Sequence, residues 1–302
     1  MRLAVLASPS SWYLEDLRRA AGDAHRIECI AFDRLWADLY QDQGGTIQAE
    51  QHRLGQFDAV LVRTMPPGSL EQVVFRMNAL GQIAQAGVTV LNPPRAIEIA
   101  VDKYLASARL LDAGLPTPRT RVCQSVDEAM AAFDALGGDV VVKPVFGGEG
   151  RGIIRVEDES LARRVFGALV QIDAVIYVQK FVRHHGYDIR LLVLGDQVYG
   201  MRRINDVDWR TNVSRGARTE PLVPDPTLVD IARRASAAVG APFVGVDVLP
   251  DQSGNLYVLE VNAVPGWRAL ARTLKIDVAA RLLAYLASQN AEASVDIPAG
   301  PD

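Results

Sequence analysis

The sequence predicts a protein of the α/β (α+β) class that begins with a parallel α/β unit. Three observations lead to this prediction. Short apolar runs alternate with amphipathic helical segments over residues 1–92, which is the pattern of a parallel sheet covered by helices. A strand, a glycine-rich loop and a second strand follow over 140–156. From residue 175 onward, strand-like segments dominate.

Apolar runs that end in turn-forming residues define the strands of the first unit. The first run stops at Ser8-Pro9-Ser10, and the third stops at Met65-Pro66-Pro67-Gly68. We therefore predict an N-terminal domain over 1–92, with strands at 3–7, 26–32, 58–63 and 88–91 and helices at 12–21 and 70–85.

The rest of the chain is expected to form two subdomains, 93–175 and 176–289, and a flexible tail, 290–302. A helix over 95–113 ends at Gly114, and Gly195-Asp196 supplies a hairpin turn. Within the last subdomain we predict strands at 175–182, 188–194, 197–203, 245–249 and 256–261, and helices at 228–239 and 276–288.

Composition excludes several classes of protein. The 302 residues include 32 Lys+Arg and 36 Asp+Glu, a net charge of −4, which argues against a generally basic nucleic-acid binder. Cys29 and Cys123 form no CxxC pair, so a zinc knuckle or disulfide framework is not expected. No stretch approaches the ~20 apolar residues of a membrane span. We expect a soluble, cytoplasmic protein without nucleic-acid or membrane partners.

Two apolar strands near the C-terminus carry polar side chains suited to a metal. Asp247 lies on one strand, and Glu260 and Asn262 lie two residues apart on the next, which places these last two on one face. Buried carboxylates are costly unless they are paired or bound to metal, and hard oxygen ligands suit Mg²⁺. The alternative is a solvent-facing strand with ordinary acidic residues.

A lysine and a glycine-rich loop indicate a phosphate site. Lys143 ends a valine-rich strand, and Lys103 lies on a helix. Backbone N–H groups of the loop can approach phosphates because its glycines lack side chains. A glycine-rich hairpin alone is more often structural, but Lys143 directly before it favours phosphate binding. The loop glycines are Gly147, Gly148, Gly150 and Gly152.

A basic and polar segment follows, with Arg202-Arg203, Arg210-Thr-Asn212 and Arg215. Several guanidinium groups beside acidic strands indicate an anion site. The alternative is a solvated surface loop.

Together, these segments resemble the ATP-grasp superfamily over nearly the whole chain, and most closely its RimK-like branch of ATP-dependent amino-acid ligases. The resemblance implies an ATP-grasp fold preceded by the N-terminal α/β domain. The matching segments are Asp102-Lys103, Val142-Lys143-Pro144, Val178–Val182, Gly186–Arg190, Trp209–Gly216, Gly245–Asp247 and Glu260–Gly266.

The resemblance also implies a role for each matching residue. Lys103 and Lys143, with loop glycines Gly147, Gly148 and Gly150, would hold ATP phosphates. Adenine would lie against the hinge formed by Gln179, Lys180, Phe181 and Val182, with its ribose bonded to Asp188. Arg202, Arg210 and Asn212 would bind the γ-phosphate or an acyl phosphate. Asp247, Glu260 and Asn262 would hold two Mg²⁺ ions, for which Mn²⁺ can substitute.

The implied reaction is amide formation between a carboxylate and L-glutamate through an acyl phosphate. Candidate acceptors are a coenzyme tail such as that of tetrahydromethanopterin, ribosomal protein S6 or an amino-group carrier protein. Segments 62–68 and 91–94 look most like the tetrahydromethanopterin type. Two other classes remain open, a non-ligase ATP-binding protein and a small-molecule kinase, and homo-oligomerisation is possible.

Overall fold

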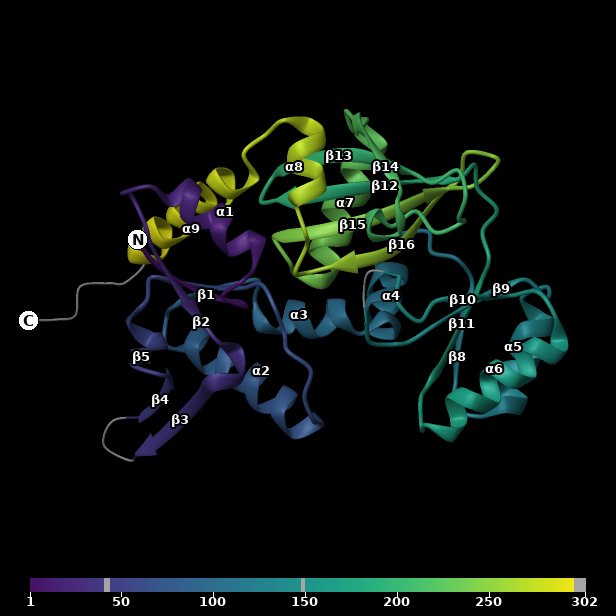
Figure 1. The fold of residues 1–302 in the computed structure, drawn as a ribbon, viewed down its shortest axis with the longest axis horizontal. Helices are drawn as coiled ribbons and strands as arrows, with labels where there is room; N and C mark the ends of the chain where they lie inside the picture. Colours follow the sequence, from purple (N-terminus) through teal and green to yellow (C-terminus); the bar gives the residue numbers. More distant parts are fainter. Residues whose placement is uncertain (41–43, 148–149, 296–302) are drawn as a thin grey trace, which may run out of the picture.

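The computed structural model describes residues 1–40, 44–147 and 150–295 (Figure 1). The described chain contains a parallel sheet at the N-terminal end, a small three-stranded sheet beside it and two further sheets of four and five strands. Helices and strands are mixed throughout, and the prediction of an α/β class with an N-terminal parallel sheet is confirmed.

The N-terminal sheet is parallel, with the strand order β2-β1-β6-β7. The order reverses between β1 and β6, so their carboxyl ends flank the switch point of the sheet. Interior strand residues are apolar, as expected for a sheet covered on both faces. The strands are β1 (Arg2–Leu6), β2 (Arg26–Ile30), β6 (Ala59–Val62) and β7 (Thr89–Leu91), and the helices are α1 (Trp12–Ala21) and α2 (Leu70–Gln85).

A small antiparallel sheet that we did not predict follows β2. It consists of β3 (Leu35–Tyr40), β4 (Gly44–Ala49) and β5 (His52–Arg53). Its side chains are largely exposed or only partly buried, so an apolar run does not mark these strands.

The glycine-rich loop belongs to a four-stranded antiparallel sheet in the order β10-β9-β11-β8. Two helices pack on this sheet around a separate core that includes Phe133 and Phe166. This unit lies at the right of Figure 1. Its elements are β8 (Thr120–Cys123), α5 (Val126–Ala135), β9 (Val140–Lys143), β10 (Ile154–Val156), α6 (Glu159–Gln171) and β11 (Ile176–Lys180).

The C-terminal region is built on a five-stranded antiparallel sheet in the order β14-β13-β12-β15-β16. Helix α7 (Pro226–Val239) packs against it. The strands are β12 (Tyr187–Leu194), β13 (Gln197–Ile204), β14 (Arg218–Leu222), β15 (Phe243–Pro250) and β16 (Leu256–Asn262).

Two helices, α3 (Pro94–Val101) and α4 (Lys103–Asp112), replace the single helix predicted over 95–113. Asp102 separates them because its carboxylate caps the second helix, accepting hydrogen bonds from the N–H groups of Tyr104 and Leu105 at 2.9 and 3.1 Å. The cap places Lys103 at the first position of α4.

The N-terminal sheet and the C-terminal sheet are joined by polar and apolar contacts. Asn92 is 1% exposed, and its side-chain amide donates to the carbonyls of Phe243 and Ala263 at 2.6 and 2.5 Å. Helix α8 (Arg268–Leu274) follows, and α9 (Val278–Val295) packs against α1 (Figure 1).

Helix α9 runs past the predicted end at residue 288, and only 296–302 of the predicted tail lie outside the described residues. Within the described part of the chain, none of the helices combines the length and apolarity that a bilayer crossing requires.

Candidate active site

The predicted metal-binding residues lie on one face of the C-terminal sheet. Strands β15 and β16 are antiparallel neighbours, with Asp247 opposite Glu260 and Gly245 opposite Asn262. Directly opposed residues of an antiparallel pair project from the same face, and so do residues two apart on one strand. The structure therefore brings Asp247, Glu260 and Asn262 together, as the sequence predicted.

A network of buried charges surrounds Asp247. Arg190 Nη1 donates to Asp247 Oδ1 at 2.5 Å, and Arg203 Nη2 lies 2.9 Å from Asp247 Oδ2. Arg203 also forms a two-pronged pair with Asp188 at 2.8 and 2.5 Å. Burial opposes ionisation of Asp247, but the two guanidinium groups outweigh it and hold the pKa of Asp247 below its ordinary value.

Arg203, which the sequence analysis left without a role, shares this face, whereas Arg202 does not. Neighbouring residues on a strand project to opposite faces, and Arg203 is 5% exposed against Asp188. Arg202 is exposed, with its guanidinium 5.6 Å from the Tyr187 ring. The placement does not support a reactive-site role for Arg202. Strand alternation from Asp188 across the hairpin was the signal that could have identified Arg203.

Glu260 and Asn262 complete a set of hard oxygen donors. Asn262 Oδ1 accepts from the N–H of Val264 at 2.9 Å, which fixes the amide at the end of β16. The Glu260 carboxylate is half-buried, and no side chain or backbone group of the described residues forms a hydrogen bond or ion pair with it. An unpaired, partly buried carboxylate beside Asp247 fits a divalent cation such as Mg²⁺.

Within the ranges that the structure describes, no group of three or more His, Cys, Asp or Glu side chains could hold a metal ion. The predicted set has only two carboxylates, and its third oxygen comes from an asparagine.

The two lysines lie beside the glycine-rich loop and have neutral partners. Lys143 Nζ donates to Gln179 Oε1 at 2.7 Å, and Lys103 Nζ donates to the Gly147 carbonyl at 2.5 Å. Burial lowers the pKa of Lys143 to about 8, partly opposed by Glu260, while nearby Lys103 lowers it further.

The side chain of Gln179 contacts Lys143, whereas the prediction placed Gln179 in the hinge against the adenine. Its side chain is buried, and its amide nitrogen donates to Thr120 Oγ1 at 2.9 Å, so its oxygen points at Lys143. Gln179 therefore orients the lysine. The remaining hinge residues are partly exposed, with Lys180 projecting to solvent.

The loop that carries Arg210 and Asn212 packs against the glycine-rich loop. Arg215 Nη2 donates to the Gly150 carbonyl at 3.2 Å. Gly150 has φ +70°, and a β-carbon there would come within 2.6 Å of Asn212 Oδ1. Position 150 therefore requires glycine, because its backbone has a positive φ and because a side chain would collide with Asn212. Gly147 is also in a positive-φ conformation, and Gly148 lies outside the described residues.

Arg210 is already engaged within its own loop. Its guanidinium is bound by the Asp208 carboxylate, with the shortest contact at 2.8 Å from Nη2 to Oδ2. These hydrogen bonds hold the pKa of Asp208 below its ordinary value. The pair keeps the arginine folded toward the glycine-rich loop.

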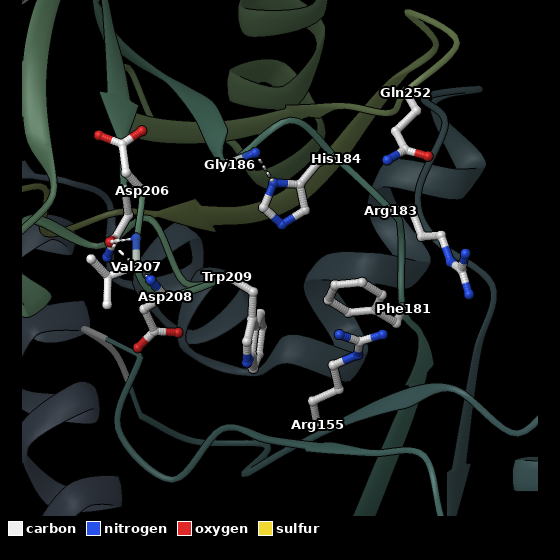
Figure 2. Close-up of a pocket in the computed structure, with 11 residues that line it drawn as sticks. Arg155, Phe181, Arg183, His184, Gly186, Asp206, Val207, Asp208, Trp209 and Gln252 are labelled. Carbon is white, nitrogen blue, oxygen red and sulfur yellow. Dashed lines mark hydrogen bonds between the residues drawn. The ribbon is translucent and has the colours of Figure 1, made fainter.

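A pocket of about 360 Å³ lies beside the hinge (Figure 2). Phe181 forms its wall together with Trp209, and their rings meet edge-on with centroids 5.6 Å apart. The Arg155 guanidinium lies 3.7 Å from the centre of the Phe181 ring. The ring of His184 also faces the pocket, and burial lowers its pKa. Of the predicted site residues, only Phe181 lines this pocket.

Comparison with known proteins identifies the family. The model of the RimK-like ATP-grasp domain matches residues 100–286. The chain is 34% identical over 262 residues to the tetrahydromethanopterin:α-L-glutamate ligase of Methanosarcina acetivorans, covering 77% of this chain and 81% of the relative. It is 30% identical over 292 residues to the ribosomal protein bS6–L-glutamate ligase of Escherichia coli, covering 95% of each.

Solved structures show the same fold. The ATP-grasp ligase PsnB complexed with minimal precursor matches with a TM-score of 0.76 and 24% identity, covering 95% of this chain and 98% of the other. A second PsnB structure, also containing Mg and ADP, matches with a TM-score of 0.74, 23% identity and coverage of 95% and 97%. The match of the family model over residues 100–286 and the relatives at 30–34% identity show that the chain is a ligase of the RimK-like ATP-grasp family.

Proposed function

We propose that this protein is an ATP-dependent α-L-glutamate ligase that adds L-glutamate to a carboxylate on the tail of a coenzyme of the tetrahydromethanopterin type. One observation supports ATP use above all others. Lys103 and Lys143 carry positive charge beside the glycine-rich loop, but their partners are an amide oxygen and a carbonyl oxygen. Two neighbouring cations that have no carboxylate partner within the described part of the chain suit a polyphosphate.

In the proposed reaction, a carboxylate oxygen of the acceptor attacks the γ-phosphorus of ATP. The bond from phosphorus to the β-phosphate oxygen breaks, which gives ADP and an acyl phosphate. The amine of L-glutamate then attacks the acyl carbon, loses a proton, and expels inorganic phosphate to leave an amide. Phosphoryl transfer depends mainly on alignment and charge stabilisation, which agrees with a site rich in Lys and Arg.

The residues of this chain would divide that work. Lys103 and Lys143 would bind phosphate oxygens, and Arg210 and Asn212 would stabilise the charge on the acyl phosphate. Mg²⁺, held by Asp247, Glu260 and Asn262, would neutralise phosphate charge when bound. Arg190 and Arg203 would position Asp247, because they fix both of its oxygen atoms.

The hinge would receive the adenine through its backbone. The N–H groups of Lys180 and Phe181 are already bonded to the carbonyls of Arg119 and Asp139 at 2.8 and 3.0 Å. The next N–H group, that of Val182, has no backbone acceptor among the described residues and could bind a ring nitrogen. Both Asp188 oxygens are engaged by Arg203, so a contact from Asp188 to the ribose would have to share them.

The acceptor is proposed from the relatives. The methanogen ligases named for tetrahydromethanopterin support it, and the bS6 ligase of E. coli supports the main alternative. The test is to incubate the enzyme with ATP, Mg²⁺ and labelled L-glutamate. Acceptors of the tetrahydromethanopterin, deazaflavin and S6-tail types are supplied separately, and products are followed by mass spectrometry.

We expect a glutamyl mass increment and stoichiometric ADP with the tetrahydromethanopterin-type acceptor. An increment confined to the S6 tail would transfer the assignment to that protein acceptor. Phosphorylation of an alcohol without any glutamyl product would contradict the ligase reaction and indicate a kinase.

A further inference from the structure

Arg63, the first residue after β6, is buried without a hydrogen-bond acceptor. The residue is 7% exposed, and its Nε and Nη1 atoms are shielded from solvent with no partner among the described residues. Its guanidinium carbon lies 4.6 Å from the Tyr13 ring centre and 4.5 Å from that of Trp267. Burial lowers the pKa of Arg63 to about 10, so the group is still charged at neutral pH.

The positive charge of Arg63 has no balancing anion among the described residues. Removing an unpaired charge from water costs more free energy than contacts with aromatic rings return. Asp16, whose carboxylate contacts this cluster, is bound to other groups, because it accepts from Trp267 Nε1 at 2.9 Å and from Arg19. Arg203, by contrast, is similarly buried and has two anionic partners, Asp188 and Asp247.

Arg63 lies at the switch point of the parallel sheet. The N–H groups of Arg63 and Thr64 both donate to the Leu6 carbonyl, which ties the carboxyl ends of β6 and β1 together. Strand order reverses between these two strands. In open α/β sheets, ligands bind outside the carboxyl ends of the strands at this point.

The start of helix α1 adds polar groups at the same place. The loop from β1 to α1 contains Ser8, Ser10 and Ser11, and the side chain of the N-cap residue Ser11 caps no helical N–H group. Tyr13, which contacts Arg63, is the second residue of this ten-residue helix. An anion near a helix N-terminus is stabilised by the helix dipole and by free N–H groups.

The same cluster is connected to the proposed metal site. Trp267 lies on the loop that follows Asn262 at the end of β16, and β16 runs toward the N-terminal sheet in Figure 1. Gly266 packs against Tyr13 so closely that a β-carbon would lie 2.5 Å from the tyrosine oxygen. A substrate that reaches from Asn262 toward the N-terminal sheet therefore approaches Arg63.

We propose that Arg63 binds a carboxylate group of a ligase substrate at this switch point. This inference rests on the proposed function, in which L-glutamate brings carboxylates that do not react and the acceptor brings the carboxylate that is activated. A guanidinium N–H forms a strong, charge-assisted hydrogen bond with a carboxylate oxygen, and Nη2 of Arg63 is not among the shielded atoms. The bound anion would also neutralise the buried charge.

The kinetic test uses Arg63→Met, which keeps a flexible apolar stem, and Arg63→Lys, which keeps a charge without the planar fork. The control is Arg281→Met, because Arg281 also lies over a ring, 5.2 Å from Tyr199, but is exposed on α9. We expect Arg63→Met to raise one substrate KM about 10- to 100-fold, with the KM for ATP unchanged. A raised KM for L-glutamate assigns the carboxylate to the amino acid, and a raised KM for the acceptor assigns it to the acceptor.

A binding test does not depend on turnover. Thermal unfolding is measured with Mg²⁺ and a non-hydrolysable ATP analogue, with and without L-glutamate or the acceptor. We expect one of these carboxylates to raise the Tm of the wild type and of Arg281→Met but not of Arg63→Met. Without ligand, Arg63→Met should unfold at the same or a higher temperature, because a buried unpaired charge has been removed.

Unchanged KM values together with a lowered ligand-free Tm in Arg63→Met would overturn the inference and make the arginine a packing residue. Failure of the proposed function has a different signature. The wild type would then form no glutamyl product, yet a Tm rise with carboxylate that depends on Arg63 would still support the anion site.

Discussion

Two charged regions of the active site differ in how their charges are balanced. On the C-terminal sheet, Asp188, Arg190, Arg203 and Asp247 form a paired network in which every member contacts an opposite charge. Across from it, the partners of Lys103 and Lys143 among the described residues are neutral oxygen atoms. The charges of the first region balance one another without a ligand, whereas the positive charges of the second region are not balanced by these partners.

The two regions are therefore suited to different roles, one to fixing the geometry of the site and the other to binding ligands. A paired network in the interior fixes geometry, because breaking any pair leaves an uncompensated buried charge. Cations with neutral partners retain the capacity to bind an anion, and the adjacent Glu260 retains the capacity to bind a cation. We therefore expect substitutions in the paired network to affect stability and those around it to affect ligand binding and turnover.

The largest effect is expected from Glu260→Gln. The change removes the carboxylate that has no protein partner while keeping its size, so Mg²⁺-dependent turnover should fall by more than about 10³-fold with little change in Tm. The measurement is ADP release with the preferred acceptor. Glu71→Gln on the exposed face of α2 is the matched control, and near-wild-type turnover in Glu260→Gln would remove Glu260 from the metal site.

Arg203→Met should break the paired network. Asp188 and part of Asp247 would be left buried without a counter-charge, so we expect a loss of about 3–5 kcal/mol in the free energy of unfolding, measured by urea denaturation. The neighbouring substitution Arg202→Met, on the opposite face of β13, should cost less than about 0.5 kcal/mol. Equal losses for the two variants would contradict the proposed division of the strand faces.

Arg210→Ala tests the reactive loop. Its guanidinium should matter most where negative charge has grown, so we expect kcat to fall about 10²- to 10³-fold with a much smaller change in the KM for ATP. Arg163→Ala on α6, whose ion pair with Glu159 is exposed, serves as the control. A change confined to KM would show that Arg210 acts in ground-state binding only.

The shared face of Asp247, Glu260 and Asn262 and the place of Lys143 at the end of a strand were predictable from the sequence because each depends on local pattern. Strand alternation placed Glu260 and Asn262 together, and the apolar run before Lys143 marked its strand. The same reasoning selected Arg202 over Arg203 because it did not carry the alternation across the hairpin from Asp188. Side-chain partners, such as Gln179 for Lys143, depend on strand register and could not be read from the sequence.

The elements of the fold were likewise predictable only where they leave a local pattern in the sequence. Alternating apolar strands and helices predicted the N-terminal parallel sheet. The small sheet of β3, β4 and β5 was missed because little of its surface is buried, so its sequence lacks an apolar signal. Arg63 was assigned only to the end of a strand, since the rings of Tyr13 and Trp267 come from distant segments and meet only in the folded chain.

Lys143→Met tests the unbalanced region directly. Loss of one charged contact with phosphate typically costs about 1.5–3 kcal/mol, which is roughly 10- to 150-fold in Kd for ATP. Adenosine binding, measured by calorimetry on the same variant, should be nearly unchanged because the proposed contact of the ammonium is with phosphate. A similar loss for both ligands would mean that Lys143 acts by supporting the fold of the hinge.

The smallest effect is a pH dependence that should be carried by Lys143. Burial lowers the pKa of Lys143 to about 8 in the ligand-free protein, and phosphate binds only its protonated form. Above pH 8, nucleotide binding must therefore take up a proton, and the Kd for ADP with Mg²⁺ should rise up to about tenfold per pH unit, while it stays flat just below pH 8.

The stability of the ligand-free protein should respond with the opposite sign. Between pH 8 and the ordinary lysine value of 10.5, the unfolded chain binds more protons than the folded one, so this group makes the fold more stable as pH rises. Both dependences should disappear in Lys143→Met, and their persistence there would assign them to another group.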